Sequence, residues 1–270
     1  MSVRGLCLGL AIAGATAGIP VATPARAQSM LDMVDLMSPA FTQAEMSRAD
    51  IEKAIAGLPE GEKLDLFGKA LNKLDLSGMD LRRVNLQAAR LMGSDLSGAN
   101  LEGVNLDSAW ALNSNWTRVN LKGASLFGTQ LIGAKLDGAD MSGARVAGDF
   151  SKASMTGANL DGADLSADEK NQSMGLMRGT FRSANLEGAS LKGANLRRAL
   201  IEYTSLRNAD LTGASLAGSE LGGSDFTEAN VAGADFAEAD LNSAHIGAMR
   251  NADKALNIDK AKNVDRAFRN

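Results

Sequence analysis

The side chains that most often carry catalysis are scarce in this sequence. His245 is the only histidine and Cys7 the only cysteine among 270 residues. A serine or cysteine nucleophile needs a neighbouring base, so such a site would have to be built on His245. No histidines and cysteines have the spacing of a zinc site, and no glycine-rich segment has the spacing of a phosphate-binding loop. We therefore expect no enzyme activity, no metal and no cofactor.

The strongest grouping of charged side chains is acidic and lies near the C-terminus. No lysine or arginine occurs between Arg207 and Arg250, whereas this stretch contains seven acids. They are Asp210, Glu220, Asp225, Glu228, Asp235, Glu238 and Asp240. The stretch is either a candidate site for a protein partner or a surface that keeps the protein soluble. The mild net charge of −4 gives no expectation of nucleic-acid binding.

The elements that must position these residues follow a period of five. A large apolar residue recurs at every fifth position from Leu66 to Val146, slips by one residue at Phe150, and resumes from Phe181 to Ile246. Of the 35 centres, only Ala111 is not large. Alanine occupies 20 of the 35 positions two residues before the centre, Asp or Asn often precedes the centre, and glycine often lies two residues after it. The repeat is therefore A-(D/N)-L-x-G.

A period of five fits neither a helix nor a plain strand. A short extended pair followed by a turn returns to the same orientation after five residues, and glycine tolerates the positive φ of many turns. Four such sides close a coil of about 20 residues, and coils stack at the spacing of paired strands. The centre and the small residue then point inward. Stacking also places Asp225 beside His245, most simply as a surface ion pair, and Glu220 above Asp240 in one column.

Tandem runs such as Ala99-Asn100-Leu101-Glu102-Gly103 resemble the pentapeptide-repeat family over roughly residues 64–248. The resemblance implies an all-β fold, a right-handed quadrilateral β-helix. A solenoid exposes its core at both ends and needs caps. We expect residues 28–63 to form a short α-helical N-terminal cap, with a helix from Gln43 to Ala56 begun by a capping box of Thr42 and Glu45. Residues 249–270 lose the repeat and are expected to be a C-terminal cap or tail.

An insertion at residues 166–180 is the one large interruption of the repeat. Insertions on a rigid scaffold often carry function. Its apolar residues are candidate contacts for a partner, or they pack back on the solenoid. These residues are Met174, Leu176 and Met177.

The N-terminus has the features of a cleavable secretory signal. Arg4 precedes an apolar stretch from Leu6 to Ala17, and Ala25-Arg26-Ala27 is a cleavage site before Gln28. The alternative is a retained N-terminal anchor. Cleavage after Ala27 removes two arginines and no acid, so the net charge changes from −4 to −6. No other apolar stretch has membrane length, so we expect a periplasmic or secreted protein with no stable membrane insertion.

These features favour a non-catalytic protein-binding or structural scaffold of the cell envelope. The protein partner is unknown, and a solenoid end is a candidate homodimer surface. One alternative is a DNA mimic, because some members of the family that this chain resembles, the gyrase-protecting quinolone-resistance proteins, imitate an acidic DNA rod. The signal sequence and basic residues such as Arg82 and Arg197 argue against that alternative. An enzyme of unknown type built on His245 is the least favoured alternative.

Overall fold

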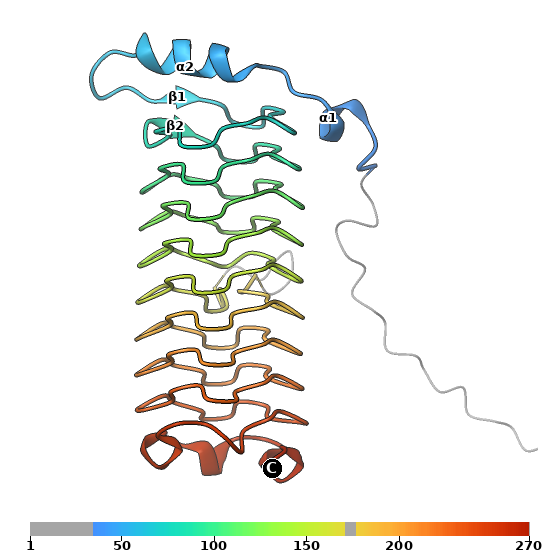
Figure 1. The fold of residues 1–270 in the computed structure, drawn as a ribbon, viewed down its shortest axis with the longest axis vertical. Helices are drawn as coiled ribbons and strands as arrows, with labels where there is room; N and C mark the ends of the chain where they lie inside the picture. Colours follow the sequence, from blue (N-terminus) through green and yellow to red (C-terminus); the bar gives the residue numbers. More distant parts are fainter. Residues whose placement is uncertain (1–34, 171–176, 270) are drawn as a thin grey trace, which may run out of the picture. The chain divides into compact units, whose positions relative to one another are not determined.

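The computed structural model describes residues 35–170 and 177–269. Every element below belongs to the unit Leu36–Asn270. This unit is a stack of coils that begins at residue 64 (Figure 1). Within the described residues, no helix combines the length and the apolar character needed to span a membrane.

Neighbouring coils pair through parallel bridges in four columns. In the part of the chain that the structure describes, strands β1 (Leu64–Asp65) and β2 (Val84–Asn85) are the one pair longer than a single residue. The other bridges are single residues, as where Asp95 pairs with Asn115 and Asn115 with Lys135. In these regular coils each bridge partner lies 20 residues further along the chain, so the predicted coil of four pentapeptides is confirmed.

The interior is filled by the two inward positions of the repeat. All the centres from Leu66 to Ile246 are buried, as are most of the small residues two positions before them. The turn is closed by the N–H of Ala99, which donates to the carbonyl oxygen of Leu96 at 3.0 Å. Within this turn Gly98 has a φ of +63°. The Asp or Asn before the centre caps the turn, as Asp95 does by accepting the N–H of Ser97 at 2.8 Å.

The predicted register slip at Phe150 is confirmed by the bridges. Gln130 pairs with Asp149, which is only 19 residues further on. In the next coil Asp149 pairs with Thr180, 31 residues further on, so the insertion adds eleven residues to the 20 of a coil. Both irregularities lie at one corner of the stack, because the carbonyl of Gly148 accepts the N–H of Thr180.

Glycine replaces the usual inward alanine at this corner. A Cβ at Gly148 would lie 2.5 Å from the carbonyl oxygen of Thr129, and one at Gly179 would lie 2.9 Å from that of Leu165. Both obstacles are backbone atoms, which cannot move aside without disturbing the bridges. The slip therefore compresses the inward position until only glycine fits.

The N-terminal segment carries two helices, α1 (Pro39–Thr42) and α2 (Arg48–Ala56). The α2 helix packs on the first coil through Ile51, which is only 1% exposed. Its capping box is formed by Ser47 and Asp50. The predicted capping box and the predicted start at Gln43 were therefore wrong.

Contacts with the first coil explain this difference. The carboxylate of Glu45 accepts hydrogen bonds from the N–H of Ala70 at 3.1 Å and from the Lys69 ammonium at 3.0 Å. The preceding Ala44 forms an antiparallel bridge with Leu71. Residues 43–46 thus bind to the first coil, and the N-cap of the helix is the next serine, Ser47.

The C-terminal residues form a last, wider coil. Residues 250, 256, 262 and 268 bridge to residues 230, 235, 240 and 245, so the separation grows from 20 to 23 along the coil. Three short 3₁₀ helices supply the extra residues: η2 (Ala252–Lys254), η3 (Ile258–Lys260) and η4 (Val264–Arg266). Each follows an asparagine in the left-handed region, with φ of +54° to +57°.

Candidate functional site

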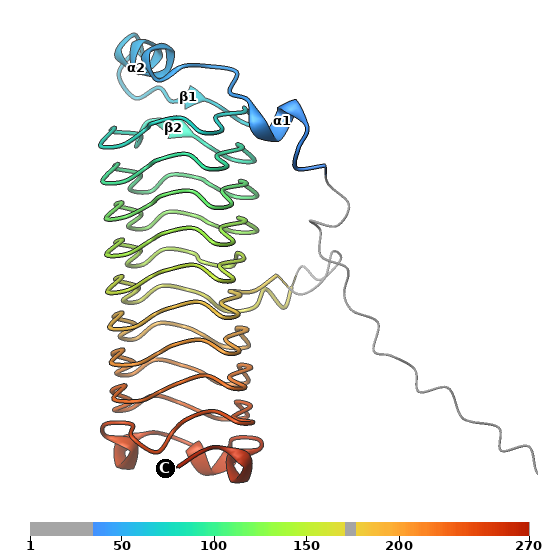
Figure 2. The ribbon, with the colours of Figure 1, turned by 45° about the vertical axis from the view of Figure 1, so that its right-hand side comes forward.

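We call residues 166–180 the arm. Its two described legs lie side by side, since the N–H of Asp168 donates to the carbonyl of Met177 at 2.8 Å. They leave the side of the coil stack (Figure 2). Of the three apolar candidates, Met174 and Leu176 lie outside the described residues. The half-buried Met177 packs back on the solenoid, where its methyl carbon lies 3.2 Å from the position of a Cβ at Gly128.

One hydrogen bond and two ion pairs join the base of the arm to the walls of the solenoid. Arg145 donates to the carbonyl of Ser166 at 3.0 Å. Glu169 forms an ion pair with Arg198 at 3.0 Å. Arg178, whose side chain is 19% exposed, forms an ion pair with Glu220 at 2.7 Å. This last contact joins the arm to the acidic stretch, so the structure brings the two predicted regions together at Glu220.

The seven acids do not lie on one face. The predicted stacking of Glu220 over Asp240 is confirmed, because the two form a parallel bridge. The residues Asp210, Asp225 and Asp235 belong to the three other bridge columns. The remaining two, Glu228 and Glu238, occupy turn positions with φ of +59° and +58°. The structure therefore spreads this charge around the coil.

Four of the seven acids form ion pairs with cations outside the acidic stretch. Their partners are Lys192 for Asp210, Arg178 for Glu220, Arg207 for Asp225 and Lys262 for Glu238. Burial acts to raise the pKa of Asp225, but hydrogen bonds from the side chain and N–H of Thr227 and the Arg207 guanidinium outweigh it and lower the pKa. Cations next to four of the seven acids thus neutralise part of the charge of the stretch.

His245 is placed for packing. Its ring centroid lies 4.8 Å from that of Phe268, and its backbone bridges to Asp225. The carboxylate of Asp225 binds Arg207 and Thr227, so the predicted ion pair between Asp225 and His245 was wrong. Among residues 35–170 and 177–269, no three His, Cys, Asp or Glu side chains are grouped so as to hold a metal ion.

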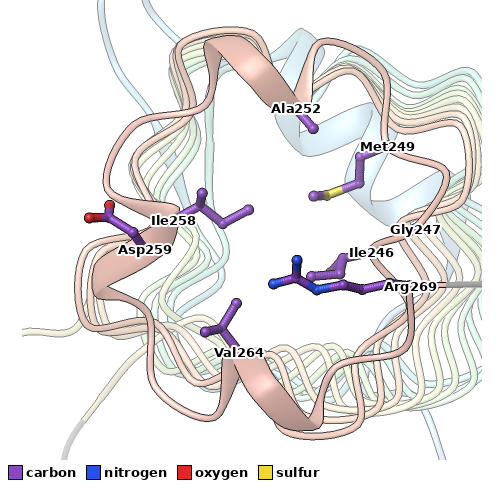
Figure 3. Close-up of a pocket in the computed structure, with 8 residues that line it drawn as sticks. All are labelled: Ile246, Gly247, Met249, Ala252, Ile258, Asp259, Val264 and Arg269. Atoms are coloured by element: carbon purple, nitrogen blue, oxygen red, sulfur yellow. The ribbon is translucent and has the colours of Figure 1, made fainter.

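The C-terminal end holds a cavity of about 580 Å³, which sequence reasoning missed. Figure 3 shows Ile246, Met249, Ile258 and Val264 pointing into it, with Arg269 extending across. The signal that could have revealed it is a period of six residues, Asn-x-Asp-(Lys/Arg)-Ala-x, beginning at residues 251, 257 and 263. A search limited to a period of five passes over it.

Comparison with known families agrees with this geometry. Residues 71–109, 112–143, 148–167, 180–216 and 204–242, more than half of the chain, match the model described as pentapeptide repeats, in eight copies. The breaks after residues 143 and 167 coincide with the register slip and the arm.

Solved structures show the same likeness. QnrB1, a plasmid-mediated fluoroquinolone resistance protein, is similar with a TM-score of 0.57 and 17% identity, covering 74% of this chain and 92% of that one. HetL, a pentapeptide repeat protein involved in heterocyst differentiation regulation from the cyanobacterium Nostoc sp. strain PCC 7120, is 24% identical with a TM-score of 0.33, covering 83% and 94%. At these identities the likeness to QnrB1 concerns the fold alone. Among curated proteins, no sequence matches the chain.

Proposed function

The chain belongs to the pentapeptide-repeat family, and from this premise we propose that it is an exported, non-catalytic protein-binding scaffold of the cell envelope. The β-helix supplies a rigid wall on which single residues can be changed without disturbing the core. Binding is the activity that such a wall supports best, because many of its described carboxylates cap turns or form surface ion pairs, as Asp95, Asp225 and Glu220 do.

One observation carries this proposal, the arm. It adds eleven residues to one coil of a stack that is otherwise nearly regular. Its base is held on both sides, by Arg145 at Ser166 and by Glu220 at Arg178. An insertion with no role would gain nothing from such anchoring, whereas a binding element must be presented in a fixed place.

Export is supported by the residues before the repeat. The apolar stretch from Leu6 to Ala17 and the site at Ala25-Arg26-Ala27 fit a signal peptide. Amino-terminal sequencing of the protein recovered from the periplasm or the medium is expected to begin at Gln28. A product that retains Met1 would overturn this part of the proposal.

Capture experiments test the scaffold function. Deletion of residues 167–177 joins Ser166 to Arg178 and restores the five-residue spacing from Leu165 to Phe181, so a folded arm-less variant serves as the matched control. We expect the processed wild-type chain to recover one envelope protein reproducibly, and the purified pair to bind directly. The arm-less variant is expected to lose that partner. No partner for either chain, or equal recovery by both, would count against the role of the arm.

DNA mimicry is the alternative that the QnrB1-like fold raises. The structure gives it less support, because the acids lie in different bridge columns and four of the seven form ion pairs. A continuous column of negative charge is what imitation of a DNA backbone requires. Strong inhibition of gyrase supercoiling by micromolar processed protein would favour the mimic over the scaffold.

A further inference from the structure

The side of the solenoid that carries the bridge column of Glu220 and Asp240 contains a small notch. Its volume is about 160 Å³. Glu202 and Tyr203 lie on one coil, Glu220 with Gly222 and Gly223 on the next, and Asp240 on the third. The floor is therefore glycine backbone, and the walls are carboxylates and one aromatic ring.

Gly222 keeps this notch open, and the fold does not require a glycine there. Its φ does not lie in the left-handed region, and an added Cβ would approach nothing closer than the carbonyl oxygen of Asn242 at 3.5 Å. The same position on other coils of this side holds Leu112, Ile132 and Glu202. Neither the backbone conformation nor a clash therefore requires glycine at position 222. The effect of the missing side chain is an open space.

Tyr203 forms a fixed aromatic wall. It is 68% exposed, yet its ring lies directly against the neighbouring coil. A Cβ at Gly223 would lie 2.5 Å from Cδ1 of this ring, so the glycine lets the ring pack against the backbone. An exposed ring held in one place by backbone is a suitable surface for a cation.

The notch already holds one guanidinium group at its edge. Nη1 of Arg178 donates to Oε1 of Glu220 at 2.7 Å and to the carbonyl of Arg198 at 3.2 Å. In contrast, the donors to Asp240 in the described part of the chain are neutral, the N–H of Asn242 at 2.9 Å and the side-chain amide of Asn263 at 2.8 Å. Among the ion pairs of the described residues, none includes Asp240.

We propose that this notch binds an arginine side chain of the partner protein. Its guanidinium would stack on the ring of Tyr203 and donate hydrogen bonds to the carboxylate of Asp240, while Arg178 stays on Glu220. Arginine fits better than lysine because its planar group can stack and donate at the same time. The proposal rests on the protein-binding function above and names the chemistry that the partner must present.

A single reporter makes the test direct. Tyr203 is the only tyrosine in the chain, so protein grown with 3-fluorotyrosine gives one fluorine resonance, at the notch. The probe is acetyl-Gly-Arg-Gly amide, and the matched control peptide has citrulline in place of arginine. We expect a saturable shift with the arginine peptide, with a dissociation constant of about 1 mM or lower, and no saturable shift with the citrulline peptide.

Two variants separate the notch from general electrostatics. Gly222→Leu fills the space, and Asp240→Asn removes a carboxylate that has no ion-pair partner among the described residues. Each is expected to weaken binding by about tenfold or more while the circular-dichroism melt stays cooperative. Asp235→Asn is the matched control, because Asp235 lies in another bridge column and likewise accepts a side-chain amide, from Asn257. It is expected to bind like the wild type.

Some outcomes overturn the proposal. These are a fluorine signal that does not respond, an equal response to citrulline, or folded Gly222→Leu protein that binds as well as the wild type. A partner captured equally by wild type and Gly222→Leu would also overturn the notch, yet it would leave the scaffold function standing. Arginine binding without any protein partner would support the notch and count against the scaffold.

Discussion

At the scale of the residue, side-chain volume decides which residues fill the interior of the coil stack, which we call the bore. Trp116 fills a centre that is a leucine in the coils directly before and after it, Leu96 and Leu136, and in the same coil the centre at Ala111 is small. Ser114 connects the two, since its hydroxyl donates to the carbonyl of Ala111 and accepts the indole N–H of Trp116, the latter at 2.6 Å. The one centre that departs from a large apolar residue thus accompanies the bulkiest one.

This pairing predicts coupled substitutions. Trp116→Leu leaves a cavity and is expected to lower the free energy of unfolding by about 2–4 kcal/mol. Ala111→Leu overfills the coil and is expected to cost about 1–3 kcal/mol. In the double variant each defect relieves the other, so denaturant unfolding should give a loss smaller than the sum by about 1 kcal/mol or more. Strict additivity would contradict the account of the bore.

The aspartates before the centres let us predict how the free energy of unfolding depends on pH. Asp225 accepts the N–H and the hydroxyl of Thr227, and its pKa is lowered from the ordinary 3.8 although burial acts to raise it. A carboxyl with a lowered folded-state pKa stabilises the fold fully above its unfolded value, and this contribution is lost as the pH falls through the folded value. Stability is therefore expected to fall in acid.

Asp225→Asn tests this directly. Asparagine keeps an oxygen that can accept the same N–H, as Asn115 does five coils earlier in the same bridge column, where it accepts the N–H of Thr117 at 3.2 Å. At pH 7 the change is expected to cost less than about 1 kcal/mol, because the ion pair with Arg207 is exposed. Between about pH 5 and pH 2 the variant should lose less stability than the wild type. Identical slopes would contradict the argument.

At the scale of the element, the corner of Gly148 and the arm shows how a regular coil accommodates irregular length. The coil that is one residue short is followed by the coil that is eleven residues longer than the regular 20, and the bridges on either side keep their partners. The four columns therefore absorb both changes at a single turn, so the arm is an addition to a stack that does not depend on it.

Deleting residues 167–177 is accordingly expected to preserve the fold. The entropy of closing a loop of eleven residues costs about 2 kcal/mol, against the loss of the exposed ion pair between Glu169 and Arg198. We expect the free energy of unfolding to rise by about 1 kcal/mol, measured by urea denaturation of the processed chain. The contrasting variant Gly148→Ala should lower it by about 2 kcal/mol, because its Cβ would meet backbone oxygens. A deletion that unfolds the protein would contradict this account.

The sequence predicts these elements unevenly, for physical reasons. The coil period, the slip at Phe150 and the place of the arm follow from local spacing, since each inward position must hold an apolar or small residue. The helix start could not be predicted, because Thr42 with Glu45 and Ser47 with Asp50 offer the same capping chemistry, and the contact of Glu45 with Ala70 decides between them. The ion pair of Arg178 and Glu220 spans 42 residues and depends on how the arm folds back.

At the scale of the whole solenoid unit, the two ends differ. The α2 helix covers the first coil with Ile51. Within residues 35–170 and 177–269, no helix covers the last coil in this way, and its cavity of about 580 Å³ opens at the end of the solenoid. Each 3₁₀ helix of this coil carries one acid and one base. These are Asp253 and Lys254 in η2, Asp259 and Lys260 in η3, and Asp265 and Arg266 in η4. Such an end suits a second copy, because a two-fold partner can set each acid opposite a base.

We therefore expect the processed protein to form a homodimer through its C-terminal end. Closing the cavity removes Ile258 and Val264 from water, which favours association by about 1 kcal/mol or more for each buried side chain. Sedimentation equilibrium should give a dimer whose dissociation weakens by about tenfold or more in Ile258→Asp. Leu256→Asp is the control, because Leu256 lies in the same coil but outside the cavity lining and is 53% exposed. A wild-type chain that stays monomeric at high micromolar concentration would leave the bore open to solvent and overturn this expectation.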